Sequence, residues 1–145
     1  MTLQQPTLIK TGDLPGAPFA AWAKGFLLLQ GILFSLLAVL LFLVPAFMST
    51  LWPWKITPVL AQMYAGPLLS YGLGSLFLSR QRKWLGVRAI LPGMLVFTAT
   101  TVMISFLHIG LFSFNEVAAL LWFGWFIIAS LLLVLLTFGA LWIRE

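Results

Sequence analysis

His108 is the one side chain of this sequence whose type suggests the ligation of a cofactor. It is the only histidine, and it lies at the end of an apolar run. An imidazole in that position is typical of an axial ligand to a haem or to a chlorophyll-type pigment. The alternative is a histidine that hydrogen-bonds a carbonyl group or a lipid headgroup. The lack of a second histidine favours this alternative, and a transition-metal site, which needs three or four ligands, is less favoured still.

Gln30 and Gln62 are amide side chains placed within or beside apolar runs. Such an amide can contact a bound quinone, pigment or substrate. His108 and Gln62 are therefore the candidate cofactor-binding residues, and one or the other is expected at the polar end of a pocket. The more common role of an intramembrane amide is a hydrogen bond to a neighbouring helix, worth about 0.6 kcal/mol, and we favour that role.

A catalytic or proton-translocating centre is not indicated by the sequence. The chain has no cysteine, which excludes thiolate metal sites and cysteine nucleophiles. Glu116 is the only acidic residue away from the termini, and the apolar runs carry no central charge. No base, nucleophile and orienting group converge. We therefore expect neither an enzyme nor a proton-driven pump.

The composition places the chain in a lipid bilayer. Its residues are 62% hydrophobic and 8% charged, whereas a soluble domain carries about 25% charged residues. The net charge of +5 does not indicate nucleic-acid binding, because the basic residues gather in a short segment between apolar runs. The expected partners are membrane lipids and other integral membrane subunits, with no nucleic acid.

Four apolar segments are long enough to cross a hydrocarbon core, which requires about 20 residues. They cover 25–47, 58–78, 86–107 and 117–143. None shows the alternation of a β-barrel strand. The sequence predicts an all-α fold in which residues 1–145 form a single domain of four transmembrane helices. Residues 1–20 are expected to form an N-terminal arm.

Local residues support the helix starts. Thr57 followed by Pro58 predicts an N-cap with proline at the first helical position. Ser113 and Glu116 have the spacing of a capping box, which places the start of the last helix just after them.

Prolines predict where the helices end or bend. Pro45 is expected to end the first helix. Pro67 falls mid-span and is expected to kink the second helix, and Pro92 is expected to do the same near the start of the third.

The basic residues predict the direction of the spans, since cytoplasmic loops collect Lys and Arg. One group lies between the second and third spans: Arg80, Arg82, Lys83 and Arg88. Lys10, Lys24 and Arg144 flank the two ends, and only Lys55 falls on the other side. We therefore expect a multi-pass membrane protein with both termini in the cytoplasm.

Tryptophans near the span ends are expected to anchor the bundle at the membrane interfaces, where an indole buries its ring and hydrogen-bonds its N–H. The candidate anchors are Trp52, Trp54, Trp84 and Trp142.

The segment WPWKITP at 52–58 resembles a W-P-W-x-[LI]-T-P hairpin between two spans. The pairs Ala65-Gly66 and Gly72-Leu73-Gly74 that follow are similar too. This pattern resembles a family of small uncharacterised bacterial inner-membrane proteins of four spans. The resemblance covers the middle third of the chain, implies the fold, and brings no activity with it.

Gly66, Ser70 and Gly74 recur every four residues and share one helix face. Such a stripe of small residues lets another helix approach closely. The sequence leaves open whether that helix belongs to the same bundle or to a neighbouring subunit.

Three functions remain. The favoured one is a non-catalytic auxiliary or structural subunit of a larger membrane complex, in a respiratory or photosynthetic setting. The alternative is a binder or carrier of a hydrophobic molecule: a quinone, a carotenoid, a chlorophyll-type pigment or a lipid. It predicts an apolar pocket between the second and third spans. A small transporter is the least favoured, because no span carries a midplane charge.

Overall fold

The computed structural model describes residues 19–84 and 87–142, and the side chains of these residues up to 139. Over these residues the fold is all-helical, with no strand. The helices are α1 (Ala21–Leu43), α2 (Pro45–Leu51), α3 (Pro58–Ser79), α4 (Leu91–Leu107) and α5 (Val117–Trp142), with a single 3-10 turn, η2 (Ile109–Leu111).

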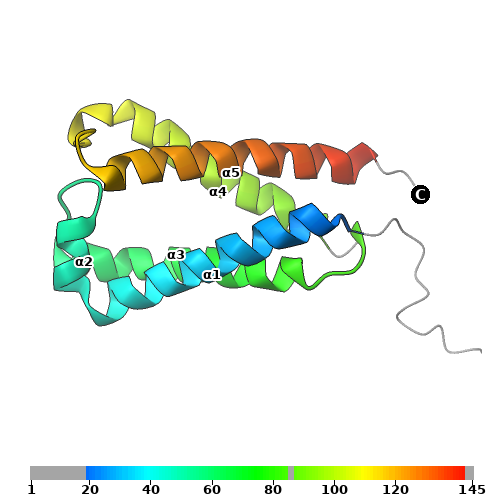
Figure 1. The fold of residues 1–145 in the computed structure, drawn as a ribbon, viewed down its shortest axis with the longest axis horizontal. Helices are drawn as coiled ribbons and strands as arrows, with labels where there is room; N and C mark the ends of the chain where they lie inside the picture. The colour runs from blue at the N-terminus through cyan, green and yellow to red at the C-terminus, as the bar shows by residue number, and fades with distance from the viewer. Residues whose placement is uncertain (1–18, 85–86, 143–145) are drawn as a thin grey trace, which may run out of the picture.

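The long helices form two antiparallel hairpins that lie alongside each other (Figure 1). In the first, α1 packs along α3, and in the second, α4 packs along α5. One end of the bundle carries α2, the turn that follows it and η2, and we call it the α2 end. The opposite end carries the start of α1, the turn after α3 and the end of α5.

Two glycines hold the α1–α3 seam together by letting the two backbones approach. A Cβ atom added to Gly72 would lie 2.6 Å from Ser35 Oγ and 2.7 Å from the Ser35 backbone nitrogen. One added to Gly31 would lie 2.6 Å from Leu76 Cγ. No side chain larger than hydrogen fits at either position without moving a neighbour.

The contact between the two hairpins is made instead by aromatic side chains. Phe34 of α1 packs edge-on against Phe126 of α5, with ring centroids 5.6 Å apart. The ring centroids of Tyr71 in α3 and Phe97 in α4 lie 4.8 Å apart. We call this contact the hairpin interface. Its rings keep the helix backbones apart, whereas the seam brings them together.

Apolar residues cover the outside of the bundle, where large side chains such as Leu36, Phe42 and Leu135 are exposed. Two helices are long and apolar enough to cross a membrane, Ala21–Leu43 and Val117–Gly139. The apolar helix α4 is shorter, at 17 residues. These features are consistent with a membrane protein.

Two of the predicted helix starts are confirmed. The Thr57 side chain accepts a hydrogen bond from the Leu60 backbone N–H at 3.3 Å, and Pro58 begins α3. Helix α5 begins at Val117, directly after Glu116. The backbone N–H of Glu116 donates to the Ser113 carbonyl at 2.8 Å. Ser113 and Glu116 thus form a turn that precedes the helix. They are not part of its first turn.

Three expectations about the helices are corrected. The predicted span 25–47 is divided, because α1 ends at Leu43 and Pro45 starts α2; proline suits a first helical position, where its missing N–H costs nothing. The predicted span 86–107 starts late, since residues 87–90 form turns. Pro92 therefore lies in the first turn of α4, where it removes no helical hydrogen bond and has no cause to bend the helix.

Helix α3 runs from Pro58 to Ser79 with Pro67 inside it, and the kink expected there stays a prediction. The N-terminal arm lies almost entirely outside the described residues, as do Lys10 and Arg144.

Candidate functional site

The two predicted cofactor-binding residues do not come together in one site. His108 caps the end of α4, is exposed, and has its ring Nδ1 3.1 Å from the Ile104 carbonyl of its own helix. Gln62 is exposed near the start of α3, and its amide donates to the Phe42 carbonyl of α1 at 3.2 Å. Each side chain therefore makes the backbone hydrogen bond that was the alternative to ligand binding.

The small-residue stripe faces away from the other helices of the chain. Gly66 and Ser70 are exposed, Gly74 is half-buried, and a Cβ atom on either glycine would meet nothing within 4 Å. The face of α3 that meets α1 is the adjacent one, which carries Gly72 and Ser75. Of the two partners that the sequence left open for the stripe, a helix within the described bundle is therefore not observed. A helix from a neighbouring subunit stays a prediction.

The tryptophans predicted as interface anchors pack against other side chains of the bundle. Trp52 and Trp84 are buried, at 5% and 7% exposure, and Trp54 is half-buried. Trp52 packs against Trp54, Tyr64 and Trp122. Their position at a membrane interface stays a prediction. The side chain of Trp142 lies outside those described.

The predicted basic group gathers at the end opposite α2. Arg80 caps α3, and the Arg82 carbonyl accepts a hydrogen bond of 3.0 Å from the Phe19 N–H just before α1. Lys83 and Arg88 follow in the same turn region and are half-buried. The start of α1 and the turn after α3 are thus tied together, and the basic residues cluster around this junction.

An apolar cavity of about 270 Å³ lies between α3, α4 and α5. We call it the aromatic cavity, and its walls include Tyr64 and Pro67 of α3, Phe97, Thr101 and Ser105 of α4, and Trp122 and Phe126 of α5. It lies between the two helices where an apolar pocket was predicted, and it includes Pro67. Gln62, His108 and Pro92 are not among its lining residues.

Three polar side chains of this cavity, from α4 and α5, already have partners. Trp122 Nε1 donates to Ser105 Oγ at 3.0 Å, and Ser105 Oγ donates to the Thr101 carbonyl at 2.8 Å. Thr101 Oγ1 donates in turn to the Phe97 carbonyl at 2.8 Å. With its donors satisfied in this way, the cavity presents an almost entirely apolar wall, which suits a hydrophobic ring or chain.

Gln30 forms the hydrogen bond to a neighbouring helix that the sequence predicted, but the sequence did not locate its partner, Ser75 of α3. Gln30 is fully buried, and its amide nitrogen donates to Ser75 Oγ at 3.0 Å. Ser75 Oγ donates to the Tyr71 carbonyl at 2.9 Å. Gln30 Oε1 and the Tyr71 hydroxyl are both buried without a hydrogen-bond partner. The signal was available, since Gln30 and Ser75 are polar residues in apolar helices, but their pairing depends on the packing of α1 and α3.

The described residues contain no group of three or more His, Cys, Asp and Glu side chains able to hold a metal ion. Comparisons with protein-family models, with curated proteins and with solved structures find no match. The resemblance of the 52–58 hairpin to small four-span bacterial proteins stays a prediction.

Proposed function

We propose that this protein is a four-span bundle of the bacterial inner membrane, with cytoplasmic termini, that serves as a non-catalytic accessory subunit of a larger membrane complex. The observation that carries this proposal is the outward stripe of Gly66, Ser70 and Gly74 on α3. Lipid chains need no such surface, whereas a partner's transmembrane helix gains close van der Waals contact from it.

The surroundings of the stripe support the same occupant. Gly66 also lines a groove of about 470 Å³ between α1 and α3, whose other walls include Ala38, Phe42, Met63 and Leu69. Apart from Gln62, the groove is lined by apolar residues. A helix rich in apolar residues fits it, and a charged or soluble partner does not.

The test compares a double glycine variant on the stripe with a single glycine variant on an open position of another helix. Gly66→Leu with Gly74→Leu blocks the stripe, and Gly25→Leu places the same side chain on an exposed position of α1 that is equally open. After mild extraction through a C-terminal tag, we expect the wild type and Gly25→Leu to migrate on a native gel with a larger complex. The double variant is expected to migrate alone. A bundle-sized wild-type particle, or unchanged migration of the double variant, contradicts the proposal.

The four spans and their direction are tested by cysteine labelling, which the cysteine-free sequence makes direct. Ser113→Cys at the α2 end is expected to react with a membrane-impermeant maleimide in intact spheroplasts. Ser79→Cys at the opposite end is expected to react only after the membrane is opened. Equal labelling of the two positions in intact spheroplasts contradicts the arrangement.

The aromatic cavity supports a second candidate function, the binding of a hydrophobic molecule such as a quinone, a carotenoid, a chlorophyll-type pigment or a lipid. Thr101→Trp fills the cavity, while Thr100→Trp adds the same ring on the exposed side of α4. If the cavity holds such a molecule, solvent extracts of the wild type and Thr100→Trp contain it and those of Thr101→Trp do not. Identical extracts from all three proteins contradict this function.

A further inference from the structure

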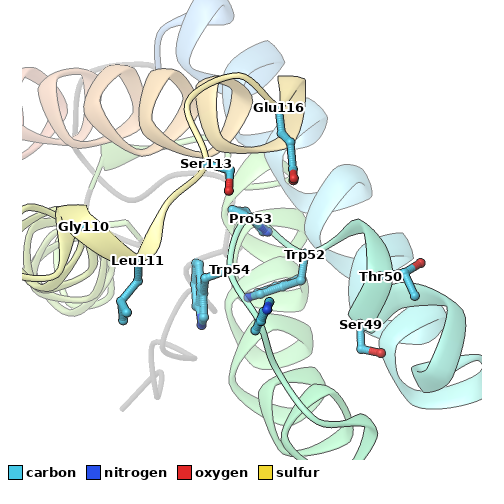
Figure 2. Close-up of a pocket in the computed structure, with 10 residues that line it drawn as sticks. Ser49, Thr50, Trp52, Pro53, Trp54, Gly110, Leu111, Ser113 and Glu116 are labelled. Atoms are coloured by element: carbon cyan, nitrogen blue, oxygen red, sulfur yellow. The ribbon is translucent and has the colours of Figure 1, made fainter.

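A second cavity, of about 450 Å³, opens at the α2 end between two loops that are far apart in the sequence (Figure 2). One wall is the segment from the end of α2 through Trp52, Pro53 and Trp54. The other is the loop before α5, from which Ser113 and Glu116 point toward Pro53 in Figure 2. We call it the end cavity.

The end cavity brings together the two charged residues of this end of the described bundle. Lys55 and Glu116 both line it, although 61 positions separate them in the chain, and no ion pair joins them. The other described charged residues, Lys24, Arg80, Arg82, Lys83 and Arg88, belong to the opposite end. The cavity therefore offers a cation and an anion as two separate sites to a single ligand.

The end cavity borders an apolar one. Trp52 and Pro53 line both it and a cavity of about 350 Å³ between α1, α2 and α5, whose walls include Leu33, Leu37, Met48 and Leu121. A ligand that occupied both cavities would meet charges in the first and hydrocarbon in the second. That order is the order of an amphiphile with a charged head and an apolar chain.

Trp52 adds a donor at the point where the two cavities meet. Its ring is 5% exposed, and its Nε1 is buried without a hydrogen-bond partner. A buried indole N–H normally finds an acceptor, and leaving it unpaired is unfavourable. An oxygen of a phosphate or of an ester linkage is an acceptor of the required kind.

We propose that the end cavity binds one zwitterionic phospholipid, whose phosphate meets Lys55, whose ammonium group meets Glu116, and whose acyl chain enters the apolar cavity beyond Trp52 and Pro53. A phospholipid with an uncharged polar head would satisfy Lys55 and leave Glu116 facing its phosphate. The pair of charges thus selects phosphatidylethanolamine over phosphatidylglycerol. This proposal does not depend on the accessory role, because the site lies within one chain.

The test is native mass spectrometry of the full chain, delipidated in detergent and offered equal amounts of phosphatidylethanolamine and phosphatidylglycerol. Because a hydrogen bond to a charged group typically contributes enough for about a tenfold change in affinity, we expect the wild type to retain phosphatidylethanolamine about tenfold better. Glu116→Gln is expected to bring the ratio of the two lipids to about one. Lys55→Gln is expected to reduce the retention of both lipids about tenfold.

Arg80→Gln is the matched control, since it removes one exposed positive charge at the opposite end of the bundle. It is expected to leave both adducts unchanged. Lys55 and Glu116 are exposed, so thermal unfolding in detergent should show both variants folded like the wild type. Equal retention of the two lipids by the wild type, a ratio that survives Glu116→Gln, or a loss caused equally by Arg80→Gln overturns the proposal.

Discussion

The α1–α3 seam and the hairpin interface are formed in opposite ways. The seam joins the two long helices of the first hairpin, and the interface joins the two hairpins to each other. In the seam, Gly31 and Gly72 bring two backbones so close that a single added carbon atom would lie under 3 Å from its neighbour. In the hairpin interface, rings such as Phe34, Tyr71 and Phe126 hold the backbones apart and leave room for cavities. The close backbone contact allows only one arrangement of α1 against α3. The side chains of the interface can turn to fit a molecule that lies between them. The candidate ligand cavities accordingly border the interface and not the seam.

The largest expected effect comes from breaking the seam with Gly72→Leu. Its Cβ would meet Ser35 backbone and side-chain atoms, so the helices must separate. We expect a loss of about 3 kcal/mol or more in the free energy of unfolding, measured by denaturant titration in detergent. Gly74→Leu, two residues away on the open face, is the control and should lose no stability. Equal losses in the two variants would mean that the seam is not close-packed.

A smaller effect is expected in the interface from Ser105→Ala. The change removes the acceptor of the Trp122 indole N–H and leaves that donor half-buried without a partner. We expect a loss of about 1–2 kcal/mol in the same titration. Ser105→Thr keeps the hydroxyl group and should recover most of the loss. A fully stable Ser105→Ala protein would show that the indole has another acceptor.

Added volume should change the free energy of unfolding in opposite directions at the two contacts: it should stabilise the protein in the aromatic cavity and destabilise it in the seam. Thr101→Leu adds apolar volume to a wall of the cavity, and it is expected to raise the free energy of unfolding by about 1 kcal/mol. The same change at the exposed Thr100 should have no comparable effect. Destabilisation by Thr101→Leu on the scale of Gly72→Leu would show that both contacts are equally rigid.

The smallest effect is expected from Gln30→Met, which removes the polar pair of the seam while keeping the length of the side chain. The hydrogen bond to Ser75 is lost, but the unpaired Gln30 Oε1 is lost with it. We expect a loss of about 0.6 kcal/mol, typical of hydrogen bonds between membrane helices. Gln30→Ala is the comparison, because it also leaves a void and should therefore lower the free energy of unfolding more than Gln30→Met does. A loss of several kcal/mol in Gln30→Met would make this pair, and not the glycines, the main determinant of the seam.

The positions of the helices were predictable from the sequence, but the faces they present were not. Thr57 and Pro58 marked the start of α3 correctly, because a cap is decided by residues next to each other in the chain. The sequence left open whether the stripe of Gly66, Ser70 and Gly74 lies on the inner face of α3, and the inner face carries Gly72 and Ser75. In a helix that is apolar all round, hydrophobicity does not mark the buried side, so two small-residue stripes cannot be ranked without the packing.

The candidate sites show the same division. Gln62 and His108 were named for their types, and each forms the kind of hydrogen bond that was favoured over ligand binding. The juxtaposition of Lys55 and Glu116 depends on how two loops from different hairpins meet, which no local pattern records. The sequence alone indicated only that Lys55 and Glu116 lie apart from the other charged residues.

The 17 residues of α4 have a consequence for the membrane that surrounds the proposed bundle. At 1.5 Å per residue, α4 is about 25 Å long and the 26-residue α5 beside it about 39 Å, against a hydrocarbon thickness of about 30 Å. The bilayer must become thinner along α4. Along α5 the bilayer must become thicker, or the helix must tilt. The protein would thus impose a lateral gradient of thickness on its lipid annulus. Neighbours with short spans would be drawn to the α4 side.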